Sequence, residues 1–333
     1  MRRAPTRELF LTFLGAAVVF AVAAGWGVYK FNAPRSAGGG DQEIIIYLPR
    51  GMALVNVARA LHQAGAVEHA GLFEWGVRLS GAERRLKAGE YALPADLSPS
   101  GVMTVLIGGK TISRSLTLPE GLTTAEILAV LRAEEMLSGE LPAEVPEGWL
   151  LPETYKYQRG DARAGLVRRM MQAMADTVNR LWPRRKRPLP FSSPLDALVL
   201  ASIVEKETAV PEERARIAGV FVNRLRKGMR LQSDPTVVYA LTDGAGPLGR
   251  PLILDDLRTD SPFNTYKVKG LPPRPIANPS RAAIEATLRP ADTDALYFVA
   301  DGSGSHVFSK SLKEHSKNVR RWRALKARRR AAQ

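Results

Sequence analysis

The longest apolar run of the sequence lies near its N-terminus and extends without a charged residue from Leu9 to Tyr29. About 20 consecutive apolar residues suffice for a helix to cross a bilayer. Arg2, Arg3 and Arg7 precede the run, and the positive-inside rule then leaves the N-terminus in the cytoplasm and exports the rest. The pattern therefore predicts a single N-terminal transmembrane anchor.

A cleavable signal peptide is the alternative to this anchor. Ala21-Val22-Ala23 is an acceptable site for a signal peptidase. The apolar run continues past that site to Tyr29, which favours an uncleaved anchor. Under either interpretation, most of the chain lies outside the cytoplasm.

A β-turn-α pattern occurs twice after a Gly/Pro/Ser-rich tether at residues 30–42. Each copy has a strand with alternating apolar positions that reaches Leu-Pro-x-Gly, at residues 48–51 and 118–121, and an amphipathic helix follows. A strand at 86–93 and a helix at 99–109 are expected between the copies. Small modules of this kind bind ligands or serve as plain structural elements, and the pattern does not distinguish the two roles.

The remaining sequence has mainly helical periodicity, so the fold class is expected to be α+β. An aromatic-rich extended segment and a Gly/Ser-linked hairpin account for the strands. The expected elements are the extended segment 149–157, helices at 161–182, 194–208 and 211–227, shorter helices from 234 and 278, a hairpin at 295–301 and 306–309, and a last helix from about Ser311.

The helix at 194–208 is apolar nearly all the way round from Ala197 to Val204, which is typical of a buried helix, yet it ends in Glu205, Lys206 and Glu207. A rotation of about 100° per residue turns Glu205 and Glu207 to different sides. The helix dipole and the adjoining apolar surface favour the neutral carboxyl that a general acid needs. Taken alone, however, these residues favour a helix end that emerges into water.

Two loops offer polar groups near that helix. Residues 229–241 contain Gln232 and Asp234, and residues 259–280 combine Asn264 with several prolines. Prolines fix the shape of a loop, while amide, hydroxyl and aromatic groups suit a carbohydrate groove. A structural Pro-rich crossover explains the second loop equally well.

Composition narrows the possible chemistry. The 333 residues include no cysteine and four histidines without H-x-x-x-H spacing, so thiol catalysis is excluded and no metal or other cofactor is expected. The net charge of +15 indicates an anionic partner. Much of this charge lies at 320–330, which is interpreted as a solvated helix end, and export disfavours nucleic acid as the partner.

Six segments, in order along the chain, resemble the endolytic murein transglycosylases of the YceG-like family. Several of these motifs are long, and the resemblance extends from the anchor to about residue 320. The segments are "EGWLLPETY" (147–155), "ASIVEKET" (201–208), "GVFVNRL" (219–225), "MRLQSDPTVVYA" (229–240), "FNTYKVKGLPPRPIANP" (263–279) and "LYFVADGSGSHVFS" (296–309).

The resemblance implies that Glu205, the first Glu of "EKET", is the catalytic residue. Enzymes of this family cleave the MurNAc-GlcNAc bond within peptidoglycan and leave a 1,6-anhydro-MurNAc end. Because the 6-hydroxyl of the sugar is the nucleophile, a single glutamate without a second carboxylate on its face is expected to suffice. Action on nascent strands in the inner membrane, as a terminase of glycan elongation with peptidoglycan synthases as candidate partners, is also implied.

Further residues are expected to hold the sugar, although Arg274 and Phe263 depart from the common Gly and Tyr of the family. The rival to an enzyme is a membrane-anchored, non-catalytic glycan-binding scaffold. The expected substrate-binding residues are Gln232, Asp234, Tyr239, Asn264, Thr265, Tyr266 and Asn278. The expected domains are a cytoplasmic tail (1–8), the anchor (9–29), a linker (30–42), a LysM-like β-α subdomain (43–114), a mostly helical catalytic domain that includes the C-terminal hairpin (115–320) and a basic tail (321–333).

Overall fold

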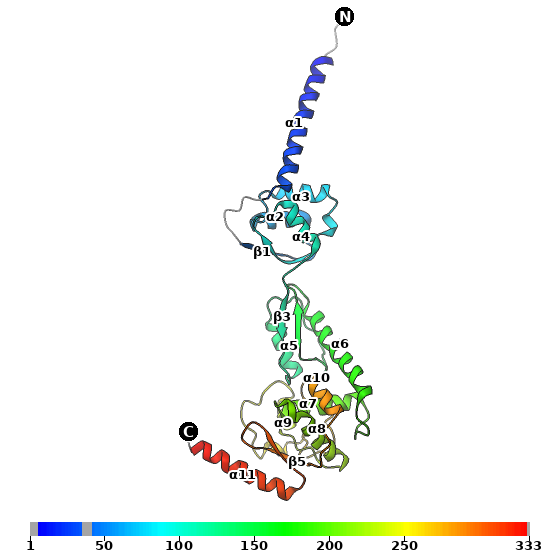
Figure 1. Cartoon of the computed structure of the whole chain (residues 1–333), viewed down its shortest axis with the longest axis vertical. Helices are drawn as coiled ribbons and strands as arrows, with labels where there is room; N and C mark the ends of the chain where they lie inside the picture. The colour runs from blue at the N-terminus through cyan, green and yellow to red at the C-terminus, as the bar shows by residue number, and fades with distance from the viewer. Residues whose placement is uncertain (1–5, 35–41, 332–333) are drawn as a thin grey trace. The chain divides into compact units, whose positions relative to one another are not determined.

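The computed structural model of the chain describes residues 6–34 and 42–331 (Figure 1). Parts of the expected cytoplasmic tail, the tether and the basic tail lie outside these residues. The chain divides into two compact units. The N-terminal unit comprises Met1–Arg114 and Lys156–Asp161, and the C-terminal unit comprises Ser115–Tyr155 and Ala162–Gln333.

Helix α1 (Thr6–Asn32) forms the first part of the N-terminal unit. The segment Leu11–Asn32 is long and apolar enough to cross a membrane, and its most apolar stretch is not buried against the protein. Phe13 and Phe20 are 70% and 73% exposed. The predicted N-terminal apolar helix is therefore confirmed, and its exposed surface is compatible with a single-pass anchor.

The rest of the N-terminal unit is a two-stranded antiparallel sheet packed against helices. Strand β1 (Glu43–Leu48) pairs with β2 (Gly89–Pro94), with Ile46 opposite Tyr91. Alternation along β1 turns Ile46 and Leu48 inward, where they join a core that includes the buried Tyr91. The other elements are α2 (Leu54–Gln63), α3 (Ala70–Leu79), the 3-10 turn η1 (Glu83–Arg85) and α4 (Pro99–Gly108). Helix α3 was not predicted from the sequence.

The C-terminal unit is mostly helical, with small two-stranded sheets, which confirms the predicted α+β class. The β5–β6 hairpin has Tyr297 opposite Ser309 and confirms the predicted hairpin. Strand β3 pairs with β4 in a second sheet. The elements are β3 (Arg114–Thr117, which begins at the end of the N-terminal unit), α5 (Thr124–Ala133), β4 (Thr154–Tyr157, whose last two residues belong to the N-terminal unit), α6 (Arg163–Leu181), η2 (Trp182–Arg184), α7 (Pro194–Glu207), α8 (Pro211–Arg226), α9 (Asp234–Thr242), η3 (Asp256–Arg258), α10 (Arg281–Leu288), β5 (Tyr297–Ala300), β6 (His306–Ser309) and α11 (Leu312–Ala331).

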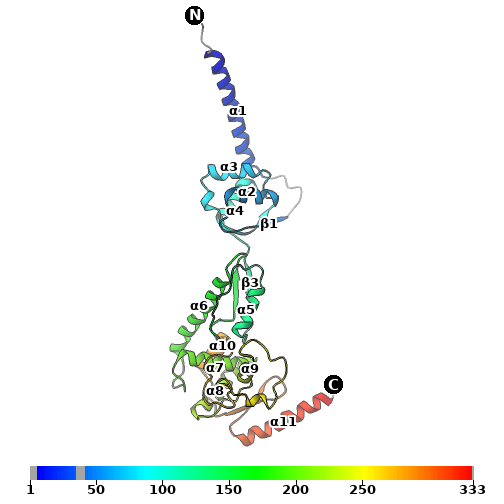
Figure 2. The same ribbon diagram turned by 180° about the vertical axis from the view of Figure 1, so that it is seen from behind.

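Helix α7 lies at the centre of this unit, and both views show α8, α9 and α10 gathered around it (Figure 1, Figure 2). Every residue from Ala197 to Val204 is buried, which confirms the interpretation of the apolar run. Leu200, with its neighbours, packs into a core shared with α8, while Leu198 faces α6 and α10. Apolar partners enclose the middle of α7 on several sides, and the last turn of the helix meets polar groups.

Candidate active site

The C-terminal end of α7 places Glu205 at the edge of the core. A capping box at Ser193 begins the helix, and Thr208, whose backbone is extended, ends it before Pro211 starts α8. Glu205 lies in the last turn, and its side chain is only 4% exposed. A carboxyl group this poorly solvated requires hydrogen-bond partners.

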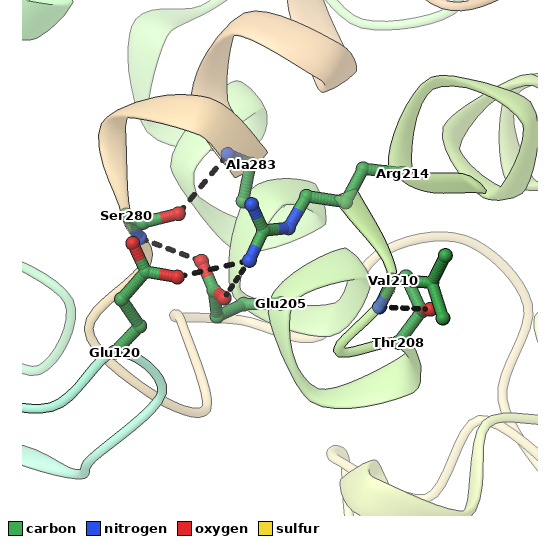
Figure 3. A network of polar contacts seen from close by, with 7 residues as sticks. All are labelled: Glu120, Glu205, Thr208, Val210, Arg214, Ser280 and Ala283. Carbon is green, nitrogen blue, oxygen red and sulfur yellow. Dashed lines mark hydrogen bonds and ion pairs between the residues drawn. The ribbon is translucent and has the colours of Figure 1, made fainter. Parts of the chain in front are cut away.

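Two partners bond to the Glu205 carboxylate (Figure 3). The backbone N–H of Ser280, at the N-cap of α10, donates to its Oε2 at 2.7 Å. The Arg214 Nη2 from α8 lies 3.4 Å from its Oε1. The N-terminus of a helix carries partial positive charge. The end of α10 and the guanidinium therefore both offset the negative charge of Glu205.

A second carboxylate shares the same arginine. The Arg214 Nη2 donates to the Oε2 of Glu120 at 2.9 Å, so one nitrogen contacts both carboxylates (Figure 3). Partial burial raises the pKa of Glu120, and the neighbouring Glu205 raises it further, while Arg214 opposes both effects. The expectation that Glu205 has no second carboxylate beside it is therefore wrong, because a turn far upstream in the sequence brings Glu120 to it.

The turn that carries Glu120 is fixed against α7 through Gly121. Gly121 has a φ of +75°, and a Cβ built there would lie 3.5 Å from the Glu205 Cγ. The Gly121 N–H donates to the carbonyl of Asn278 at 3.2 Å, and the Lys206 Nζ donates to the carbonyl of Gly121 at 3.1 Å. A glycine suits this position because its left-handed backbone carries no strain from a side chain.

Glu207 is not the solvated helix end that the sequence suggested. The Ser233 Oγ donates to the Oε1 of Glu207 at 2.5 Å. Burial of the carboxyl raises its pKa to about 7, because the charged form loses its hydration.

A hollow of about 370 Å³ opens at this end of α7. Although Glu205 and Glu207 bond to different elements, both contribute to its wall. The lining residues are Glu120, Gly121, Glu205, Lys206, Glu207, Thr208, Ala209 and Arg214.

Three residues predicted to bind sugar are partly or largely accessible and lie beside one another. The Tyr266 hydroxyl donates to the Oδ1 of Asp234 at 2.6 Å. Gln232 adopts a left-handed backbone with a φ of 52°, and its Oε1 accepts from Arg224 at 3.2 Å. Asp234 and Gln232 are exposed, and Tyr266 is half-buried. Their accessible side chains allow contact with a sugar, and the sugar-binding role stays a prediction.

The other four predicted residues are buried. The Asn264 Nδ2 donates to the carbonyls of Leu257 and Thr259, and Thr265 shares a 2.8 Å hydrogen bond with Thr236. Tyr239 packs on the ring of Phe263, and the Arg274 Nε donates to the Tyr239 hydroxyl at 3.3 Å. Asn278 accepts from the N–H of Leu150 and donates to the carbonyl of Leu122. In the described structure these four side chains support loops, so sugar could reach them only if the loops opened.

Comparison with known proteins identifies the family of this chain. The model of the YceG-like family matches residues 46–321, which is most of the sequence. The chain belongs to the YceG-like family. It is 32% identical over 305 residues to the endolytic murein transglycosylase of Bacillus subtilis (strain 168), and the match covers 82% of each protein.

Two further relatives extend the comparison. The endolytic murein transglycosylase of Streptococcus pneumoniae serotype 2 (strain D39) is 30% identical over 324 residues, which cover 83% of this chain and 58% of the relative. The crystal structure of a putative YceG-like protein from Listeria monocytogenes matches 84% of this chain and 99% of its own, with 30% identity and a TM-score of 0.49.

In this YceG-like chain, the sequence singled out Glu205 but missed the groups that contact it. Glu120 belongs to the second Leu-Pro-x-Gly copy, and the first copy has Arg50 at the equivalent position. That difference within a repeat was the available signal. Ser280 carries no comparable signal, because a helix-capping serine is a common structural residue.

Proposed function

We propose that this chain is an endolytic peptidoglycan lytic transglycosylase, with Glu205 as the acid and base. It cleaves the β-1,4 bond between MurNAc and GlcNAc and leaves 1,6-anhydro-MurNAc ends. The observation that carries the proposal is a poorly solvated carboxylate at the wall of a 370 Å³ hollow, held by Arg214 and the end of α10. Membership of a family whose curated relatives are named endolytic murein transglycosylases supports it.

In the proposed reaction, Glu205 donates its proton to the glycosidic oxygen as the bond from C1 of MurNAc to that oxygen breaks. GlcNAc leaves with a free 4-hydroxyl group. The 6-hydroxyl of MurNAc then bonds to C1, and its proton returns to Glu205. One glutamate serves both steps, no water is consumed, and the carboxyl ends in the protonation state in which it began.

Glu120 and Arg214 are proposed as positioning residues for Glu205. Arg214 holds both carboxylates through one nitrogen. Glu120 adds negative charge that favours retention of a proton in the hollow, and Arg214 limits this effect. With one proton shared between the two carboxyls the three groups are neutral together, and after its release they carry a single negative charge.

The second carboxylate raises the question of simple hydrolysis, since hydrolysing glycosidases generally use two. An inverting enzyme places the two carboxyls about 6.5–9.5 Å apart to leave room for the attacking water. Here one nitrogen of Arg214 bonds to an oxygen of each carboxylate, at 2.9 and 3.4 Å, which holds the two carboxyl groups close together. Attack by the 6-hydroxyl of the substrate itself fits this arrangement better.

The remaining roles are assigned as follows. Exposed Gln232 and Asp234, together with Tyr266, are proposed to contact the glycan, whereas buried Tyr239, Asn264, Thr265 and Asn278 hold the loops of the groove in shape. Residues 43–114 are proposed as a LysM-like glycan-binding subdomain and residues 115–320 as the catalytic domain. We propose an inner-membrane location with the N-terminus in the cytoplasm, action on nascent strands as a terminase of glycan elongation, and peptidoglycan synthases as partners.

The test compares single substitutions around one hollow. Full-length wild type, Glu205→Gln, Glu120→Gln and Glu207→Gln are incubated in detergent with purified peptidoglycan, and the products are weighed by mass spectrometry. Wild type is expected to release anhydro products, and Glu205→Gln to lose about 10²-fold or more of the rate, as for removal of a general acid–base. Glu120→Gln should keep the same product at a lower rate.

Three outcomes would contradict the proposal. A product heavier by one water identifies a hydrolase. Undiminished release of anhydro products by Glu205→Gln, together with loss of that release in Glu207→Gln, would identify Glu207 as the acid. A wild type that binds glycan without cleaving it indicates the non-catalytic scaffold.

A further inference from the structure

Helix α3 carries two apolar stripes, of which only one faces the core of its unit. Phe73 and Val77 are fully buried. Leu72, Trp75, Gly76 and Leu79 follow the i, i+3, i+4, i+7 spacing of a second stripe. Within this second stripe, Trp75 is 64% exposed and Leu79 is 76% exposed. A short helix that exposes both a tryptophan and a leucine on one side has an unpartnered apolar surface.

This second stripe lies along α1. The ring of Phe31 packs directly against Gly76, where any Cβ would collide with it, and Phe31 also packs on the core of the unit. Beside this contact, residues of α1 and α3 line an apolar hollow of about 660 Å³. The lining is apolar except at Asn32 and Ser80. Besides those two, it includes Phe20, Trp26, Gly27, Phe31, Leu72, Trp75 and Leu79.

The hollow overlaps the segment that crosses the membrane. Phe20 and Trp26, which line it, lie inside the candidate span Leu11–Asn32. Trp26 and Tyr29 stand near the end of that span, where aromatic residues concentrate at membrane interfaces. If α1 crosses a bilayer, the stripe of α3 therefore lies at the depth of the lipid boundary, not in water.

We propose that the Leu72–Leu79 stripe of α3 inserts into the leaflet nearest the folded units and that lipid acyl chains fill the hollow beside α1. The inference rests on the proposed membrane anchor. Trp75 suits this position because its ring is apolar and its indole N–H remains within reach of the headgroups. The N-terminal unit would then be held against the membrane by two helices instead of by α1 alone.

Site-directed spin labelling tests this insertion, since the chain has no native cysteine to compete for the label. Leu79→Cys is the test variant. Val55→Cys on α2 is the matched control, because Val55 is an apolar residue of the same unit that is 42% exposed and does not line the hollow. Val19→Cys, deep in the candidate span and 69% exposed, reports whether α1 spans the bilayer. The labelled full-length variants are reconstituted in vesicles of phosphatidylethanolamine and phosphatidylglycerol, and collisions with oxygen and with a water-soluble nickel chelate are measured.

The label at residue 79 is expected to collide several-fold more with oxygen, and several-fold less with nickel, than the label at residue 55. Equal nickel access at both positions overturns the inference. Spin–spin broadening at residue 79 that disappears on dilution with unlabelled protein also overturns it, because a second copy then covers the stripe. If the label at residue 19 is also open to nickel, the anchor fails and the inference fails with it. None of these spin-label measurements depends on glycan cleavage, so failure of this inference is distinguishable from failure of the proposed enzymatic activity.

Discussion

Glu205 and Glu207 are two residues apart, yet their surroundings give them different chemistry. Glu205 bonds to an arginine and a helix N-terminus, and both stabilise negative charge. Glu207 bonds to a serine hydroxyl, and loss of hydration keeps it neutral to a higher pH. The hydrophobic pattern of the helix could separate their directions but could not reveal these partners, since Arg214, Ser280 and Ser233 come from other elements.

The raised pKa of Glu207 predicts a pH-dependent stability. The unfolded carboxyl releases its proton near its ordinary value of 4.5, whereas the folded one holds it to about 7. In that range the folded state binds more protons than the unfolded state, so the free energy of unfolding falls as pH rises and levels off above about 7. Glu207→Gln keeps an acceptor for Ser233 but cannot titrate, so it should lack this decline.

Thermal melting of the detergent-solubilised protein at pH 5, 6, 7 and 8 checks this expectation. The advantage of Glu207→Gln over wild type should grow with pH, up to the order of 3 kcal/mol for a shift of this size. Glu212→Gln, at an exposed site at the start of α8, is the control and should follow wild type. If the stability of wild type and of Glu207→Gln changes in parallel across the whole pH range, the raised pKa of Glu207 is contradicted.

At the scale of elements, the start of α10 links stability to the site. The Ser280 Oγ accepts from the N–H of Ala283 at 3.2 Å and caps the helix, while the Ser280 N–H donates to Glu205. Ser193 caps the opposite end of α7 with a similar bond to Asp196. These two serine caps therefore form a matched pair, one at the site and one a full helix length away.

Ser280→Ala and Ser193→Ala are each expected to lower the free energy of unfolding by about 1 kcal/mol, the usual effect of losing a cap. Only Ser280→Ala should also lower kcat, several-fold, because fraying of the first turn of α10 displaces the N–H that orients Glu205. Urea unfolding and initial rates on peptidoglycan measure the two effects. An unchanged kcat in Ser280→Ala would show that the cap does not position the catalytic carboxyl.

The elements themselves were largely predictable, and the exception has a physical explanation. Helices α7 and α8, as well as the β5–β6 hairpin, follow clear periodic patterns with capping or turn residues at their ends. Helix α3 was missed because its two apolar stripes blur the 3.6-residue period and because Gly71 and Gly76 lower its helix propensity. The second apolar stripe of α3 faces α1, a separate element, and the pattern within α3 does not reveal that partner.

At the scale of the whole molecule, the anchor makes a prediction about fractionation. The full chain should remain in the membrane pellet after an alkaline carbonate wash, since only about 20 apolar residues in a helix are needed to span a bilayer. A fragment of residues 43–333, which retains α3 but lacks α1, should be extracted by the same wash. The intact mass of the membrane-bound protein separates the anchor from a cleaved signal peptide, which would remove the residues up to Ala23. Extraction of the full chain by carbonate would contradict a transmembrane anchor.

The sequence by itself determined what depends on local periodicity and on residue type. It specified the apolar span, the buried α7 with a carboxylate at its end, the paired β-turn-α units and the family. Only the tertiary structure decided which groups meet at Glu205, that Glu207 is partly buried against Ser233, and that α1 and α3 line an apolar hollow. Each of these depends on contacts between segments that are distant in the chain, and periodicity within a segment carries no information about its partner.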